Sequence, residues 1–161
     1  MSPPSPYSDF TELGGFVALP RVTSLAVSPD GRRVVAAVQQ PDEHGSRYVS
    51  SLWELDPDGE LAPRRITFSA KGESDPRFTA DGTLVFTSAR PDPENGADGG
   101  EDGADKSALW SLPEHGEARV LAQAPGGLSL AGVADDGTVL ASTSVLAGGS
   151  LSTDAERRKA R

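Results

Sequence analysis

A repeat of about fifty residues, marked by Asp-Gly turns, constrains this chain more than any other feature. The aspartates of three such turns are Asp30, Asp81 and Asp136, so the turns are spaced 51 and 55 residues apart. Each turn joins two short apolar stretches, and its glycine adopts positive φ without steric cost. The pattern therefore predicts three successive β-hairpins built on one plan.

Two further strand-like segments follow each of the first two hairpins. They span 47–56 and 61–68 in the first repeat, and 107–112 and 117–123 in the second. Trp53 and Trp110 occupy the same place in their repeats, 57 residues apart. The 18 glycines and 13 prolines among 161 residues argue against a helical bundle. We therefore expect an all-β chain with four strands in each complete repeat.

Four short strands in each fifty-residue unit are typical of a β-propeller blade. The sequence thus predicts an incomplete β-propeller of about two and a half four-stranded blades. We assign 1–20 to an N-terminal arm and lead-in, and 21–151 to a partial propeller with blades at about 21–70, 71–125 and 126–151. Residues 152–161 would start a charged helix, because Thr153 and Glu156 have capping-box spacing. Within the lead-in, 10–20 is either one short helical turn or an extended segment.

The predicted ring cannot close within this chain, because propellers contain about four or more blades. We therefore expect exposed strand edges and apolar sheet faces, marginal stability and a tendency to associate. A small autonomous β-sandwich is the alternative fold, and it requires the third unit to pack back on the first.

Composition excludes several classes of function. The chain has no cysteine and only two histidines, which rules out disulfides, thiolate metal sites and a three-histidine zinc site. The net charge of −9 argues against nucleic-acid binding. No stretch is long and apolar enough for a membrane span, and residues 1–10 lack the pattern of a secretory signal. We expect a cytoplasmic protein.

Three segments are candidates for chemistry, and each has a simpler interpretation that we favour. Gly148–Ser152 nearly matches a nucleophile elbow but lacks the final glycine, which favours a flexible turn. The acidic segment Pro91–Lys106 fits the calcium-loop template poorly, which favours a solvated loop. His44 and His115 each lie in a Glu-His-Gly turn, at places that match in the two repeats, which favours a role in the loops over a ligand pair or a pH switch.

The remaining candidates are arginines and tryptophans. The pairs Arg32-Arg33, Arg64-Arg65 and Arg157-Arg158 suggest solvated faces. Trp53 and Trp110 are expected in the core between blades, with stacking on a ligand as the less favoured role. We assign no catalytic residue, no cofactor-binding residue and no metal ligand to this chain.

The Ser28-Pro29-Asp30-Gly31 turn, a short apolar strand and then Leu52-Trp53-Glu54-Leu55 resemble the WD40-like propeller repeats of prolyl-oligopeptidase-family serine peptidases. The TolB type of propeller has similar repeats. Other stretches resemble the N-terminal propeller of acylaminoacyl-peptidase-like members of that family: 17–22, 47–49, 71–74, 88–91 and 156–161. The resemblance covers about residues 10–161. The second and third turns, Thr79–Gly82 and Ala134–Gly137, depart from the Ser-Pro-Asp-Gly form.

The resemblance implies that the full-length protein is a serine-type oligopeptidase. A C-terminal α/β-hydrolase domain, absent from this chain, would carry the nucleophile, acid and histidine. The propeller would be non-catalytic and would limit access of peptide substrates by size. A TolB-like or WD40-like protein-binding propeller without enzymatic activity is the alternative function.

Overall fold

The computed structural model describes residues 13–91 and 106–145, and these form an all-β chain with one short helix. The helix α1 spans Leu13–Ala18. The first sheet consists of β1 (Arg21–Val27), β2 (Val34–Pro41), β3 (Tyr48–Leu55) and β4 (Arg64–Arg65). The second consists of β5 (Glu73–Phe78), β6 (Leu84–Ser88), β7 (Ala108–Leu112) and β8 (Arg119–Ala122). The third consists of β9 (Ser129–Val133) and β10 (Val139–Ser142).

Every sheet is antiparallel, and neighbours in each sheet are neighbours in sequence. The three Asp-Gly turns join the first two strands of each sheet, as the repeat predicts. Gly31, Gly82 and Gly137 have φ values of 72°, 82° and 86°. Their amides donate to the carbonyl three residues earlier, at 2.9 Å in each turn. The local sequence therefore specifies the same turn three times.

The fourth strand of the first sheet is shorter than the 61–68 predicted from the sequence. Regular pairing is confined to β4, at Arg64 and Arg65. The Asp56 carboxylate accepts hydrogen bonds from the amides of Glu60 and Leu61, at 2.7 and 2.8 Å, which holds the incoming chain in a turn. Proline at position 63 has no amide hydrogen to donate to the ladder. Because of these local features, regular pairing with β3 begins only at Arg64.

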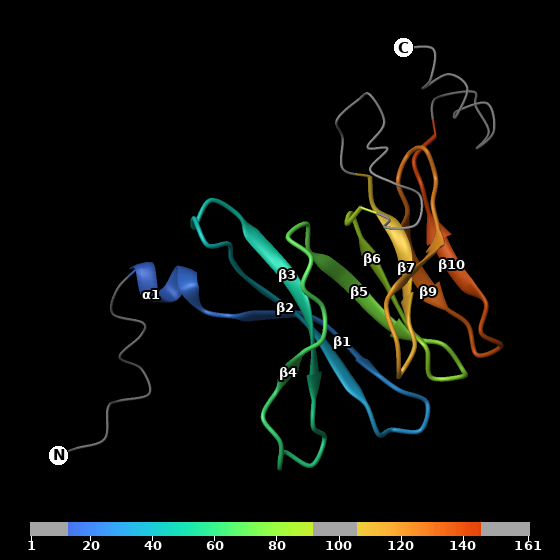
Figure 1. Cartoon of the computed structure of the whole chain (residues 1–161), viewed down its shortest axis with the longest axis horizontal. Coiled ribbons are helices and arrows are strands. Elements are labelled where there is room, and N and C mark those ends of the chain that lie inside the picture. Colours follow the sequence, from blue (N-terminus) through green and yellow to red (C-terminus); the bar gives the residue numbers. More distant parts are fainter. Residues whose placement is uncertain (1–12, 92–105, 146–161) are drawn as a thin grey trace.

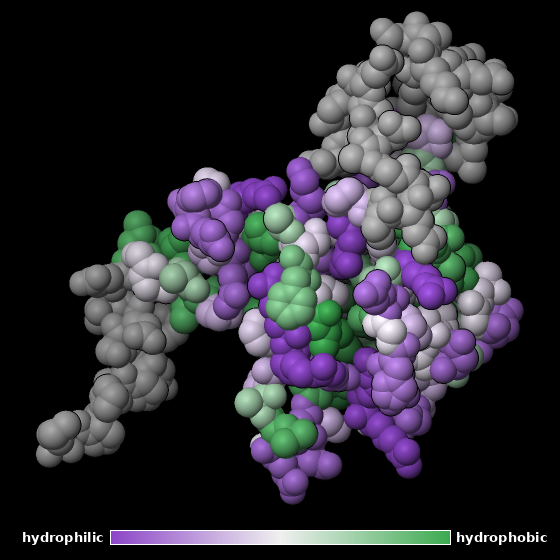
Figure 2. All heavy atoms as spheres, viewed as in Figure 1, coloured by the Kyte–Doolittle hydropathy of each residue, from purple (hydrophilic) through white to green (hydrophobic). Residues whose placement is uncertain are grey.

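The lead-in contains a helical turn rather than an extended strand. The helix α1 rests on the first sheet, where the Tyr48 hydroxyl donates to the Val17 carbonyl at 3.1 Å. The Arg21 guanidinium lies over the rings of Phe16 and Tyr48. Leu13 remains 79% exposed, and apolar residues gather around α1 on the face seen in Figure 2.

The three sheets lie side by side in chain order (Figure 1). One apolar core fills the space between the first and second sheets, and its buried members are Val35, Ala37, Leu52, Leu84, Phe86, Ala108 and Trp110. A second core joins the second and third sheets, and its buried members are Val85, Leu109, Leu128 and Leu130. Burial of each large apolar side chain contributes about 1.5–3 kcal/mol.

The third sheet packs on the second and makes no contact with the strands of the first, within the described ranges. The alternative of a β-sandwich, in which the third unit folds back on the first, is therefore wrong. The reason is that the second sheet carries an apolar face on each side, so it separates the other two sheets. The predicted blade boundaries remain a prediction. The helix start at 152–161, the nucleophile-elbow match at 148–152 and most of the acidic segment lie outside the described residues.

Candidate functional site

The candidate binding site is a cleft of about 360 Å³ between the Asp-Gly turns of the first two sheets. The β1–β2 turn contributes Asp30, the β5–β6 turn contributes Asp81, and the β7–β8 loop contributes Glu114. Arg33, immediately before β2, also lines the cleft. The first and second sheets bring these turns together because their hairpins share one design and pack face to face.

Arg33 is held between Glu54 of the first sheet and Phe78 of the second. Its Nε donates to Glu54 Oε1 at 2.7 Å, and its guanidinium lies 5.3 Å from the centre of the Phe78 ring. Burial opposes ionisation of Glu54, but hydrogen bonds from Arg33 and Arg64 outweigh it and lower the pKa of that carboxyl. Because Arg33 is neutralised in this way, the exposed carboxylates of the cleft favour cationic and N–H groups of a ligand.

The cleft also contains a serine beside an aspartate, and the geometry argues against a catalytic pair. Ser28 Oγ donates to Asp30 Oδ1 at 2.6 Å and accepts from the Arg33 amide at 2.9 Å. The Ser28 hydroxyl and the Arg32 amide lower the pKa of Asp30, which makes it a weaker base. Thr79 and Asp81 make the same contact in the second turn. The pair is therefore a repeated turn element.

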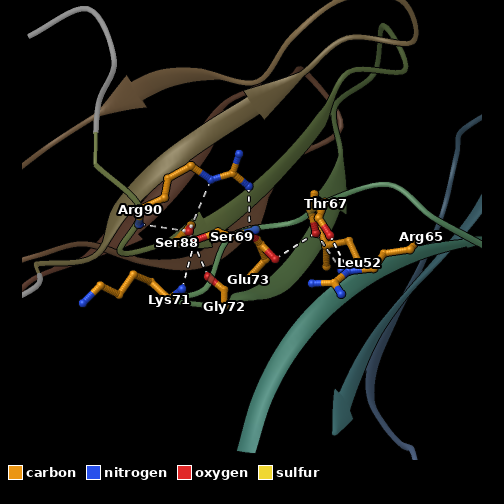
Figure 3. A network of polar contacts seen from close by, with 9 residues as sticks. All are labelled: Leu52, Arg65, Thr67, Ser69, Lys71, Gly72, Glu73, Ser88 and Arg90. Atoms are coloured by element: carbon orange, nitrogen blue, oxygen red, sulfur yellow. Dashed lines mark hydrogen bonds and ion pairs between the residues drawn. The ribbon is translucent and has the colours of Figure 1, made fainter. Parts of the chain in front are cut away.

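A second cluster of polar groups crosses the boundary between the first two sheets (Figure 3). Glu73 on β5 has a side-chain exposure of 0%, and its Oε1 accepts from Arg90 Nη2 at 2.8 Å. Its Oε2 accepts from the Thr67 hydroxyl at 2.8 Å, and the Ser69 amide donates to Oε1 at 3.1 Å. The Thr67 hydroxyl in turn accepts from the Leu52 amide of β3 at 2.8 Å. One carboxylate thus connects both sheets.

The environment of Glu73 is both buried and positively charged. Burial raises the pKa of Glu73 above its ordinary value, although the Thr67 hydroxyl, Arg90, the Ser69 amide and Arg65 lower it in part. The Arg90 guanidinium lies over the rings of Phe86 and Trp110, at 5.2 and 4.9 Å from their centres. Because both carboxylate oxygens of Glu73 accept hydrogen bonds, the cluster stabilises the contact between the two sheets.

Sequence reasoning did not assign a role to Glu73 or Arg90, which appear only within the family-like stretches 71–74 and 88–91. The sequence did contain a clue to their contact. Glu73 and Arg90 carry opposite charges, and they lie near the ends of two adjacent strand segments. Local pattern alone does not show that Glu73 and Arg90 meet 17 residues apart, or that Thr67 of the first sheet completes the contact.

The two histidines do not occupy matching places, contrary to the expectation from their Glu-His-Gly turns. His44 lies between β2 and β3, whereas His115 lies between β7 and β8. The counterpart of His115 in the first sheet is Asp58, between β3 and β4. These two connections lie at opposite ends of an antiparallel sheet, because strand direction alternates. Both histidines are exposed.

The arginine pairs do not lie wholly on solvated faces. Arg32 has a side-chain exposure of 85%, whereas Arg33 has 18% and pairs with Glu54. Arg64 is largely exposed, whereas Arg65 is half-buried, with its guanidinium over Phe68. Alternation of side chains along the strand β4 explains the difference between Arg64 and Arg65. Arg157 and Arg158 lie outside the described residues.

The expectation that both tryptophans lie in the core is half correct. Trp110 is 1% exposed between the first and second sheets. Trp53 is only half-buried, and its indole Nε1 donates to Ser51 Oγ at 3.0 Å. The difference arises because the face of the first sheet that carries Trp53 has no sheet packed against it within the described part of the chain.

The described residues contain neither a metal-binding cluster nor a membrane-spanning helix. No group of three or more histidine, aspartate or glutamate side chains in 13–91 and 106–145 is placed to hold a metal ion. Likewise, none of the helices described here has the length and hydrophobicity needed to cross a membrane.

Comparison with known proteins connects part of the chain to a peptidase. No protein-family model matches the chain. Over 70 residues it is 34% identical to dipeptidyl-peptidase 5 of Porphyromonas gingivalis, a match that covers 44% of this chain. The matched stretch is only 10% of the relative's length. The similarity supports a relationship to peptidases over that stretch.

Proposed function

We propose that this chain is the N-terminal part of a WD40-like β-propeller in a serine-type oligopeptidase of the prolyl-oligopeptidase family. The observation that carries the proposal is the similarity to dipeptidyl-peptidase 5. The repeated sheets support it, because each complete unit is a four-stranded antiparallel meander packed face to face on the next. Hydrolysis of peptides would belong to a domain beyond this chain.

The role proposed for the chain itself is to limit substrate access. The cleft between the Asp-Gly turns offers hydrogen-bond acceptors at Asp30, Asp81 and Glu114. The hydroxyl of Ser28 is already bonded to Asp30, whose lowered pKa makes it a poor general base. A cleft of this kind suits contact with peptide amides or basic side chains. We propose the cytoplasm as the compartment.

The activity is tested on the full-length polypeptide that carries this chain. We expect labelling by a fluorophosphonate probe, which reacts with activated serines, and hydrolysis of short chromogenic peptides with free or acylated N-termini. A protein that neither reacts with the probe nor cleaves any of the peptides overturns the proposal. It would favour a TolB-like or WD40-like binding propeller instead.

The gating role is tested by substrate size. Thr67→Val removes the hydroxyl that links the first two sheets, so we expect faster cleavage of a long unfolded polypeptide relative to a short peptide. Leu61→Ala, in an exposed loop, is the matched control and should leave that ratio unchanged. An unchanged ratio in Thr67→Val, with stability measurably reduced, argues against gating by this part of the chain.

A further inference from the structure

Four Asp-Gly pairs lie in the described residues, and all four share one turn backbone. In each turn the glycine has positive φ, and its amide donates to the carbonyl three residues earlier, at 2.9 Å in three turns and 3.1 Å in the fourth. All four aspartates are exposed. Backbone shape and exposure therefore do not distinguish the pairs, which are Asp30-Gly31, Asp58-Gly59, Asp81-Gly82 and Asp136-Gly137.

The four turns differ in what holds the aspartate side chain. In the turn that opens each sheet, the carboxylate accepts a hydrogen bond from the amide two residues later. The donor amides are those of Arg32, Thr83 and Thr138, at 3.1, 3.2 and 2.9 Å. A hydroxyl two residues earlier donates a second hydrogen bond to Asp30 and to Asp81. These contacts hold the three carboxylates in place.

Asp58, between β3 and β4, has neither kind of contact. The first residue of its turn is Asp56, whose carboxylate accepts hydrogen bonds and has no hydroxyl to donate. That carboxylate also accepts from the Glu60 amide at 2.7 Å, and Glu60 occupies the position whose amide holds the aspartate in the other turns. Within the described part of the chain, no hydrogen bond or ion pair holds the Asp58 carboxylate. It is therefore free to rotate toward the next peptide.

A carboxyl group in this position has a reaction available with its own backbone. The nitrogen of the next residue attacks the side-chain carbon Cγ, and a carbon–nitrogen bond closes a five-membered succinimide. The amide proton and the carboxyl hydroxyl leave together as water. Addition of water to either ring carbonyl then yields aspartate or isoaspartate, in which the backbone runs through the side chain. Glycine favours the attack because it has no Cβ to hinder its nitrogen.

We propose that Asp58-Gly59 is a site of spontaneous modification, at which isoaspartate forms faster than at the other three Asp-Gly turns. Solvent supplies the water that opens the ring, because the turn is exposed. The held aspartates react more slowly, since rotation toward the next nitrogen breaks their hydrogen bonds. Asp136 should be intermediate, because Ala134 at the start of its turn supplies no hydroxyl.

Electrostatics act in the same direction. The protonated carboxyl is the form that reacts, because a carboxylate is a poor acceptor for the attacking nitrogen. Hydroxyl donors, and then amides, lower the pKa of Asp30 and of Asp81. The Thr138 amide lowers the pKa of Asp136. Each held aspartate thus spends less time in its reactive form.

Isoaspartate at position 58 should loosen the outer edge of the first sheet. The Asp56 carboxylate accepts hydrogen bonds from three amides of the connection to β4, and the isoaspartyl linkage lengthens the backbone between them. Regular pairing of β4 with β3 covers only Arg64 and Arg65. We expect β4 to separate more readily, while the Ile66 amide keeps its hydrogen bond to the Leu52 carbonyl, 2.8 Å long here.

The test incubates the full-length polypeptide that carries this chain at neutral pH. Peptide mass spectrometry with electron-transfer fragmentation distinguishes aspartate from isoaspartate at each position. Asp30 is the matched comparison, because both turns read Pro-Asp-Gly. Isoaspartate should form severalfold faster at Asp58 than at Asp30 in the folded protein, and at similar rates in denaturant. Equal rates in the folded protein overturn the proposal, and so does the same difference in denaturant.

A substitution at the start of the turn tests the cause. Asp56→Ser supplies the hydroxyl found at Ser28 and releases the Glu60 amide, so the rate at Asp58 should fall severalfold. Asp136 in the same molecule is the control, because loss of the fold would raise its rate as well. An undiminished rate at Asp58, with that at Asp136 unchanged, overturns the proposal.

The reverse substitution is made in the second sheet. Thr79→Asp removes the hydroxyl that holds Asp81 and introduces a competing acceptor for the Thr83 amide. The rate of isoaspartate formation at Asp81 should rise severalfold, toward that at Asp58. A rate at Asp81 that stays at its original value contradicts the proposed cause, even if Asp56→Ser unfolds the first sheet.

Discussion

The first and second sheets have the same strand order, yet their strands are buried to different extents. All five residues of β6 are buried in the second sheet, because the first and third sheets cover its two faces. In the first sheet, β2 has three buried residues out of eight, and β1 has one out of seven. Burial in this protein is thus decided by neighbouring sheets more than by the strand's own sequence.

The largest expected effect comes from truncating the two equivalent tryptophans. Trp110→Ala should destabilise the chain by about 3–5 kcal/mol, because it leaves a cavity among fully buried side chains. Trp53→Ala should cost less than half as much, because part of its indole already contacts water. Denaturant unfolding of both variants checks this. Equal losses would show that the first sheet is covered on both faces in the isolated chain.

An intermediate effect should follow from removing the hydroxyl that joins the sheets. Thr67→Val leaves Glu73 without one donor and the Leu52 amide without its acceptor, which should cost about 1–3 kcal/mol. The control is Thr23→Val on the exposed edge strand β1, where the hydroxyl donates to the Ala37 carbonyl and water can replace it. Thermal unfolding of both variants tests the difference, and equal losses would contradict it.

The smallest effect is a pH dependence that belongs to the buried carboxylate. Because the pKa of Glu73 is raised in the folded state, its contribution to stability is present below its ordinary value of 4.5 and declines as pH rises. Relative to wild type, Glu73→Gln should therefore become more stable as pH increases above 4.5. Melting temperatures across pH 4–7 give the difference.

Asp81 in the β5–β6 turn provides a control of opposite sign. The Thr79 hydroxyl and the Thr83 amide lower its pKa below 3.8, so its contribution is lost as pH falls. Asp81→Asn should thus become less stable relative to wild type as pH rises from strongly acid values. If the stability of both variants relative to wild type changed in the same direction as pH rises, the assignment of a raised pKa to Glu73 would be refuted.

Much of the secondary structure follows from short-range patterns in the sequence. The Asp-Gly turns, the return strands and the four-strand plan were predicted from glycine positions and from alternation of apolar residues, and the sheets confirm them. The length of β4 was predicted wrongly, because the Asp56 carboxylate accepts hydrogen bonds from amides that would otherwise pair in a strand. These hydrogen bonds depend on side-chain geometry, which a pattern of strand-forming residues does not reveal.

The candidate site was less predictable than the turns. Asp30 and Asp81 were recognised as turn residues, but only the packing of two sheets places them on one cleft with Glu114. Arg33 was expected to be solvated, yet Glu54 and Phe78 hold it against protein. Each contact joins residues that are distant in sequence, so periodicity carried no information about it.

The amino-acid sequence by itself determined where this chain turns and which residues alternate across each strand, because φ preferences and side-chain direction are local properties. The tertiary structure alone decided that Trp110 is covered while Trp53 is partly exposed, and that Glu73 meets Thr67 and Arg90. The physical reason is that burial and ion pairing depend on what lies across a sheet face, and each sheet here obtains that cover from another sheet.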